Sequence, residues 1–165
     1  MAFNPAAEAP LVLRGLDANG APSTYEPPVV DLSEAERFDG TVTLYVHESP
    51  SPSAYRRFRA AREQLELLES AGVIEGARFV AWPERVEPST DAGAAVRSLY
   101  ESFRDAAGAA ALDPAFERSD GGLRVPALAA AAWRDGRLVG LYPLTGATVE
   151  DATARLRAGN GVENL

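Results

Sequence analysis

The sequence contains no cysteine and no lysine, and it has a single histidine. Without thiols the chain forms no disulfide, holds no cysteine-ligated zinc or iron–sulfur centre and performs no thiol redox chemistry. It also lacks any apolar run of the roughly 20 residues needed to span a membrane, so we expect no membrane partner. Positive charge is scarce: 16 arginines face 24 acidic residues, and the net charge of −8 disfavours non-specific nucleic-acid binding.

Acidic residues, arginine and alanine dominate what is present, and alanine fills 31 of the 165 positions. At molar ionic strength the Debye length falls to about 3 Å, so a densely acidic surface no longer repels itself strongly. This composition favours a protein of a salt-rich cytoplasm. A GC-rich bacterial genome, which also replaces lysine by arginine, remains the alternative. The first residues show neither a basic nor an apolar leader region, so we expect a cytoplasmic location.

Residues 1–38 are rich in Pro, Ala, Gly and acidic residues and show no sustained hydrophobic period. Residues 11–13 and 29–30 are candidates for short edge strands, and Pro27–Pro28 excludes a central strand there. We therefore predict a partly ordered arm over residues 1–38 and a folded domain over residues 39–165.

The hydrophobic pattern becomes regular after the arm. Residues 41–46 are β-branched or aromatic, which predicts a buried strand, and residues 78–82 predict a second strand. Between them we predict a helix over residues 52–71, begun by a proline and ended before Gly72. Apolar side chains spaced three and four residues apart define its buried face: Tyr55, Phe58, Ala61, Leu65 and Leu68.

The second half of the chain begins with a predicted helix, capped by Ser89 or Thr90 and reaching about residue 107. Residues 106–116 are ambiguous, because their alanines favour a helix that Gly108 and Pro114 interrupt. Residues 127–133 and 138–142 flank an Asp-Gly turn, which predicts a β-hairpin. A last helix is predicted from Thr148, where Asp151 completes an approximate capping box.

This order of elements predicts an α/β fold. Two strands connected through a long helix are expected to be parallel, and the hairpin adds an antiparallel pair. The prediction is a mixed four-stranded sheet flanked by helices, in the order strand, helix, strand, helix, hairpin, helix.

With Pro126 directly before the hairpin, this order resembles the thioredoxin fold over residues 41–158. Residues 124–128 and 133–140 are similar to that family's cis-proline, strand, Asn/Asp-Gly turn and strand. In the family the active dithiol follows the first strand, where this sequence reads His47-Glu48-Ser49-Pro50-Ser51-Pro52-Ser53. The resemblance therefore implies the fold without the oxidoreductase activity, and we expect no cofactor.

A second resemblance, closer in sequence, is to uncharacterised haloarchaeal proteins that are often labelled helix-turn-helix domain proteins. The resemblance rests on residues 44–46, 80–86 and 133–138 and on the arginine-rich helix predicted over residues 52–71. It implies a salt-rich cytoplasm and brings in a DNA-binding hypothesis.

The predicted helix over residues 52–71 carries the charge pattern relevant to DNA. Residues 65–80 resemble a winged-helix ending, and the arginines at positions 56, 57, 59 and 62 form a cationic stripe suited to phosphates. A helix-turn-helix needs another helix directly before the recognition helix, whereas a strand and a proline loop precede this one. We therefore favour a solvated helix whose arginines pair with Glu63, Glu66 and Glu69.

Positive charge in the first turns opposes the helix dipole, and a bound anion or an acidic partner would relieve that cost. Ser51 or Ser53 together with Arg56 would form such a site. Neutralisation by acid from the arm or by salt explains the same charges without a ligand, and we favour it.

His47 ends the first predicted strand, where sites of α/β proteins tend to gather. It is a candidate acid–base group, but a lone histidine without a second ligand makes a metal site improbable. No G-x-S-x-G motif surrounds the serines, and helix capping explains them better. The sequence thus predicts no catalytic or metal residues. The candidate binding residues lie around the start of the first helix and the loop before the hairpin: His47, Ser51, Ser53, Arg56, Arg57, Arg59 and Pro126.

Three functions follow from these features. We rank first a non-enzymatic, thioredoxin-like module that binds another protein or itself in a salty cytoplasm. A DNA-binding regulator of the winged helix-turn-helix type comes second. A small-molecule enzyme that uses His47 comes third.

Overall fold

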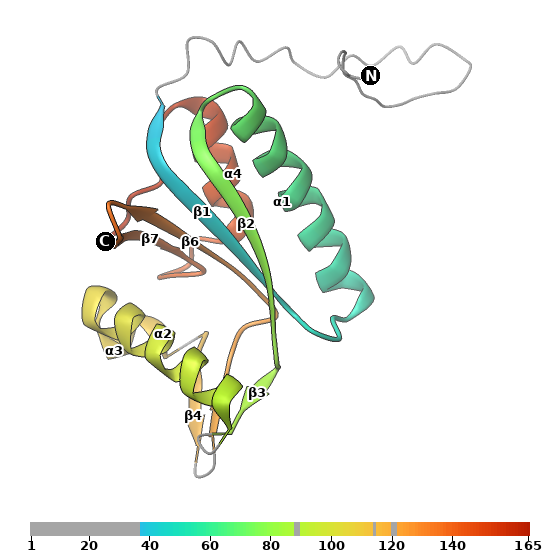
Figure 1. Cartoon of the computed structure of the whole chain (residues 1–165), viewed down its shortest axis with the longest axis vertical. Coiled ribbons are helices and arrows are strands. Elements are labelled where there is room, and N and C mark those ends of the chain that lie inside the picture. The colour runs from blue at the N-terminus through green and yellow to red at the C-terminus, as the bar shows by residue number, and fades with distance from the viewer. Residues whose placement is uncertain (1–36, 88–89, 114, 120–121) are drawn as a thin grey trace. The chain divides into compact units, whose positions relative to one another are not determined.

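The computed structural model describes residues 37–165 apart from residues 88–89, 114 and 120–121 (Figure 1). The predicted arm, including its two candidate edge strands, lies outside the described residues except for its last two positions. None of the described helices is both long and apolar enough to cross a membrane.

A mixed four-stranded sheet organises the fold, which confirms the predicted α/β class. Its strands run in the order β2-β1-β6-β7, with β1 and β2 parallel and the β1–β6 and β6–β7 pairs antiparallel. The strands are β1 (Phe38–His47), β2 (Ile74–Trp82), β6 (Leu128–Arg134) and β7 (Arg137–Tyr142). The first two begin three and four residues before the predicted starts, because pairing extends to Phe38↔Ile74, beyond the β-branched run.

Helices α1 (Pro52–Ser70) and α4 (Val149–Ala158) pack together along this sheet (Figure 1). Both begin as predicted: Ser51 caps α1 with Pro52 in its first turn, and Thr148 and Asp151 form a capping box on α4. One predicted core residue of α1 is wrong, because Tyr55 is 50% exposed. Ala54, four residues before Phe58, takes the buried place instead, whereas Tyr55 lies at the flank of the apolar face.

The β6–β7 hairpin forms at the predicted turn. Asp135 and Gly136 have φ values of 53° and 76°, as a two-residue turn of this type requires, and Arg134 pairs with Arg137 across it. The cis-proline implied at Pro126 by the thioredoxin resemblance is wrong: the Val125–Pro126 bond is trans, and the cis bond lies at Tyr142–Pro143.

A small antiparallel sheet, which the sequence did not predict, lies between β2 and β6 in the chain. Its strands run in the order β3-β5-β4, with bounds β3 (Arg85–Val86), β4 (Glu117–Ser119) and β5 (Gly122–Arg124). Helices α2 (Asp91–Ala107) and α3 (Ala109–Leu112) come between β3 and β4. Strands of two or three residues are too short to show a hydrophobic period, so pattern reasoning misses them.

Each face of the four-stranded sheet carries its own hydrophobic core. Side chains alternate along a strand, so Leu44 packs with the α1 and α4 side while Tyr45 packs with the α2 side. On the α2 side, the Tyr45 ring stacks on Trp82 with 4.5 Å between ring centroids, and Phe103 meets Tyr45 edge-on. Burial raises the pKa of the Tyr45 hydroxyl to about 12, against a smaller lowering by its hydrogen bond with Thr43.

Candidate functional site

The carboxyl ends of the parallel strands β1 and β2 meet the loop before β6, and the structure brings His47 and Pro126 together there. His47 Nε2 lies 2.9 Å from the Val125 carbonyl oxygen, and Trp82 Nε1 donates to the Pro126 carbonyl at 3.0 Å. The His47 backbone N–H also donates to Ala127 O at 3.1 Å. These bonds fix the path of the loop into β6.

The Nε2 atom of His47 makes this contact. A carbonyl oxygen only accepts, so Nε2 carries the proton and donates it to Val125. Among the residues that the structure describes, no three histidine, aspartate or glutamate side chains gather as a possible metal site. In this geometry the His47 ring holds the loop before β6.

The start of α1 combines a helix cap with a cluster of positive charge. Ser51 Oγ accepts from the Ala54 backbone N–H at 3.1 Å, which confirms the capping role predicted for the serines, while Ser53 is exposed. The first turn holds no acidic residue. From Pro52 to Arg62 the chain carries four arginines and no carboxylate, so their partners must come from elsewhere.

Two of these arginines are bound to other parts of the protein. Arg57 donates from Nε and Nη2 to the two carboxylate oxygens of Glu150 on α4, at 2.7 and 2.8 Å. This fork raises the pKa of Arg57 and lowers that of Glu150. Arg62 pairs with Glu66 at 3.4 Å and lies over the Phe79 ring, 4.7 Å from its centroid.

The expectation that the arginines pair with acids of their own helix is therefore confirmed only for Arg62 and Glu66. Arg57 instead binds a residue 93 positions away in the sequence, a partner that helical spacing cannot reveal. At 100° per residue, Arg57 and Arg62 fall on opposite flanks of the buried face of α1.

Arg56 and Arg59 remain, and both are exposed on the outward face of α1. Neither makes an ion pair with any carboxylate in the described part of the chain. Residues three apart on a helix are neighbours, with about 5–6 Å between their Cβ atoms. The two guanidinium groups, with the half-exposed Tyr55 beside them, form a cationic surface that we call the arginine pair.

The α1 region does not have helix-turn-helix geometry. Strand β1 precedes α1, and β2 follows it and pairs with β1 inside the large sheet. The winged-helix ending suggested over residues 65–80 is therefore wrong, because a wing is a hairpin at the edge of its own small sheet, not a strand parallel to the one before the helix.

Consecutive helices do occur in residues 91–112. Gly108, with a φ of 90°, joins α2 to α3, and the β4–β5 hairpin follows. Strand β3 and the β4–β5 hairpin form one three-stranded sheet, and the two helices connect β3 to β4 in the chain. However, α3 has only four residues, about 6 Å of helix, which is short for a recognition helix.

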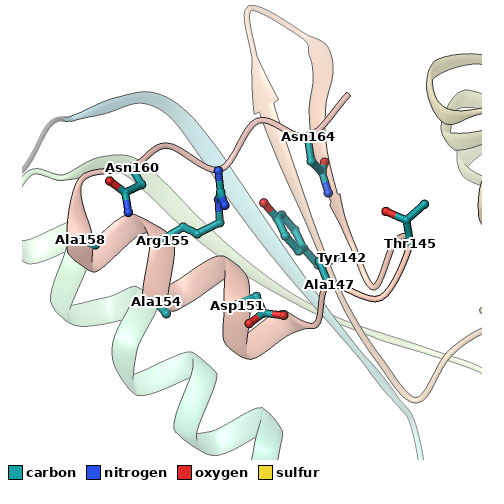
Figure 2. A pocket seen from close by; sticks show the side chains of 9 residues that line it. All are labelled: Tyr142, Thr145, Ala147, Asp151, Ala154, Arg155, Ala158, Asn160 and Asn164. Atoms are coloured by element: carbon teal, nitrogen blue, oxygen red, sulfur yellow. The ribbon is translucent and has the colours of Figure 1, made fainter.

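A cavity of about 570 Å³ lies apart from these features, between α4, the end of β7 and the C-terminal residues (Figure 2). Sequence reasoning missed it. Asp151 and Arg155 are spaced four apart on α4, but nothing local shows that Tyr142 and Asn164 complete the walls. These side chains meet only through tertiary packing.

A family model described as "Helix-turn-helix domain" matches residues 34–161, which is most of the chain. No curated protein and no solved structure significantly matches this protein.

Proposed function

The chain belongs to this helix-turn-helix domain family, and from that premise we propose that it binds double-stranded DNA through the outward face of α1. The family supports the DNA-binding hypothesis over the interaction module that the sequence ranked first. The observation that carries the choice of surface is the arginine pair, Arg56 and Arg59, which is exposed and without a carboxylate partner in the described residues.

Arginine suits this role because its planar fork donates two parallel hydrogen bonds to phosphate oxygens. Such contacts position a protein on the duplex, while base edges supply the sequence information. Helix α1 is 19 residues long, so it extends about 28 Å, and its first two turns carry the available charge. Arg57 is held by Glu150, which leaves Arg56 and Arg59 as the principal phosphate ligands.

The net charge of −8 opposes DNA at long range. Salt shortens this repulsion to a few ångströms at molar concentration, whereas direct arginine–phosphate contacts persist. We therefore include in the proposal a salt-rich cytoplasm, as the composition and the haloarchaeal resemblance suggest. Counterion release still weakens binding with salt, by a slope of about −0.9 per phosphate contact.

The test compares Arg56→Gln/Arg59→Gln with the wild-type protein in a DNA-binding titration across a KCl series. We expect the double variant to bind more weakly on every sequence, because phosphate contacts carry no sequence information. The slope of log K against log[KCl] should become shallower by about 2, the value for two lost contacts. Fluorescence anisotropy with labelled duplexes measures both quantities.

Arg97→Gln/Arg118→Gln is the matched control, since it removes the same charge from α2 and β4, where neither arginine has an ion pair in the described residues. We expect this variant to retain most of the affinity. If it loses binding and the α1 variant does not, the DNA surface is the α2–α3 and hairpin region. Absence of saturable binding to any duplex would refute DNA binding itself.

A second proposal retains the thioredoxin-like module that binds a protein or a second copy of itself. The order β2-β1-β6-β7, with one parallel and two antiparallel pairs, favours it. Its contact surface would be the end of β1 near His47, Ser53 and Pro126. Sedimentation equilibrium at about 100 μM tests self-association: a concentration-dependent dimer that Ser53→Arg disrupts supports it, and a monomer throughout removes that version.

A further inference from the structure

The cavity beside α4 is lined by polar and charged side chains together with three alanines. Asp151, Ala154, Arg155 and Ala158 lie on one face of the helix, at spacings of three and four residues. Tyr142 and Asn164 line the side toward β7, and Asn160 lies beyond the end of the helix. The volume of about 570 Å³ is within the range of small-molecule sites.

Opposite charges on this wall do not neutralise each other. Asp151 and Arg155 have the spacing of a helical ion pair, yet they form none. Arg155 Nε instead donates to the Gly161 carbonyl at 3.0 Å. Asp151 Oδ2 accepts from the Thr148 backbone N–H at 2.7 Å and from its hydroxyl at 3.1 Å.

The side chains of Arg155 and Asp151 each retain atoms that, within the described residues, are free to bind a ligand. The Nη atoms of Arg155 and the Oδ1 atom of Asp151 have no hydrogen-bond partner among the described residues. Arg155 is held by its Nε bond, so the end of its fork is oriented before any ligand arrives. A cation and an anion therefore line the same cavity, and each has a hydrogen-bonding atom that no described residue uses.

Tyr142 lines the same cavity as both charges. Its hydroxyl donates to the Val162 carbonyl at 2.9 Å, and its ring lies beside α4 (Figure 2). Burial raises the pKa of this hydroxyl; Arg155 lowers it, while Asp151 and Glu163 raise it. The hydroxyl oxygen can still accept a hydrogen bond, and the Asn160 side chain has no partner among the described residues.

We propose that this cavity binds a free amino acid as its zwitterion. The Arg155 fork takes the carboxylate, Asp151 Oδ1 accepts from the ammonium group, and the alanines at positions 147, 154 and 158 leave room for the side chain. A ligand with both charges satisfies the unused side of each wall group, whereas a ligand with one charge satisfies only one. This site is separate from the arginine pair and does not depend on DNA binding.

The test is a titration of the full chain, labelled with ¹⁵N, using glycine, L-leucine and L-glutamate as probes. Acetate and methylammonium each carry one of the two charges and serve as comparison probes. We expect saturable shifts of the α4 and 159–164 amides with at least one amino acid, with a dissociation constant of about 1 mM or tighter. Each single-charge probe should bind at least about tenfold more weakly.

Ala154→Leu fills the cavity without removing any hydrogen bond, and leucine is a good helix former, so the protein should remain folded. We expect it to weaken amino-acid binding at least about tenfold. Ala60→Leu, an exposed position on α1, is the matched control and should bind as the wild type does. Ala158→Leu repeats the test if Ala154→Leu disturbs the spectrum of the free protein.

Three results would overturn the proposal: no saturable shift with any of the three amino acids, acetate binding as tightly as the amino acids, or undiminished binding to the cavity-filling variants. Because no DNA is present in this titration, its failure leaves the proposed DNA-binding function untouched.

Discussion

At the scale of single residues, tertiary neighbours determine whether an arginine of α1 is paired within the protein or left exposed. Arg57 and Arg62 are bound by Glu150 and by Glu66 with Phe79, whereas Arg56 and Arg59 point outward. The helical period of α1 predicts which arginines flank the buried face. It cannot predict Glu150, because that residue arrives beside α1 only when α4 packs against it.

The Arg57–Glu150 fork leads to a prediction on acid stability. Its hydrogen bonds hold the pKa of Glu150 below the ordinary 4.5. A carboxylate whose pKa is lower in the folded state stabilises the protein above the unfolded value, and this contribution is lost as the pH falls through the folded value. Glu150→Gln should therefore cost about 0.5–1 kcal/mol at neutral pH, since both side chains are about half exposed.

Urea unfolding of the variant and the wild type at pH 7 and at pH 3 measures this difference. We expect the gap in unfolding free energy to be smaller at pH 3 than at pH 7, because Glu150 loses its charge as the pH falls toward and through its lowered folded-state pKa. Glu75→Gln, an exposed position with no ion pair in the described residues, should show no gap at either pH. An equal gap at both values would show that the side chain contributes by packing and not by charge.

At the scale of elements, strand β6 shows tertiary context overriding local propensity. Four consecutive alanines, Ala129–Ala132, have the highest helix propensity, yet they form a central strand buried on both faces. The sequence identifies this strand only because the Asp-Gly turn marks a hairpin. No turn motif of this kind identifies the short strands β3, β4 and β5, so the sequence does not predict them.

The α2 side of the sheet should depend on one side chain above others. Phe103 is fully buried, with ring centroids 5.8 Å from Phe116 and 6.4 Å from Trp133. Phe103→Ala removes these contacts and leaves a cavity between α2 and the sheet, so we expect a loss of about 3–5 kcal/mol in unfolding free energy. Chemical denaturation followed by tryptophan fluorescence measures it.

Leu67→Ala provides the comparison, because Leu67 is 50% exposed on α1 and its loss should change stability by no more than about 0.5 kcal/mol. Equal costs for the two substitutions would mean that α2 does not share the core of the sheet, contrary to the contacts of Phe103 with Phe116 and Trp133.

At the scale of the whole molecule, the candidate sites differ in how far the sequence could reveal them. The arginine pair is visible as a run of cations without acids, because all its residues are local. The cavity joins β7, α4 and the segment after it, so its two charges and Tyr142 meet only in the folded chain. For His47 and Pro126, the sequence predicts the region they share but not their contact, since the positions of strand ends and connecting loops follow from the element order.

The chain has 24 acidic and 16 basic residues, and this excess of negative charge leads to a prediction on how its stability responds to salt. Low ionic strength leaves acidic surface groups to repel one another across about 10 Å or more, and about 1 M KCl reduces that range to about 3 Å. The ion pairs of the described residues have partners that are mostly exposed, so screening removes little stability from them. Relief of repulsion should therefore dominate.

We expect the thermal midpoint to rise by about 3 °C, or about 1 kcal/mol, between low and molar KCl. Chloride is preferred to sulfate here, because sulfate stabilises most proteins by exclusion from their surface whatever their charge. Glu75→Gln/Asp105→Asn removes two exposed acidic charges, and its midpoint should rise less steeply with KCl if repulsion is the cause. A midpoint that falls with KCl would mean that the ion pairs, Arg57–Glu150 foremost, stabilise this protein more than its excess charge destabilises it.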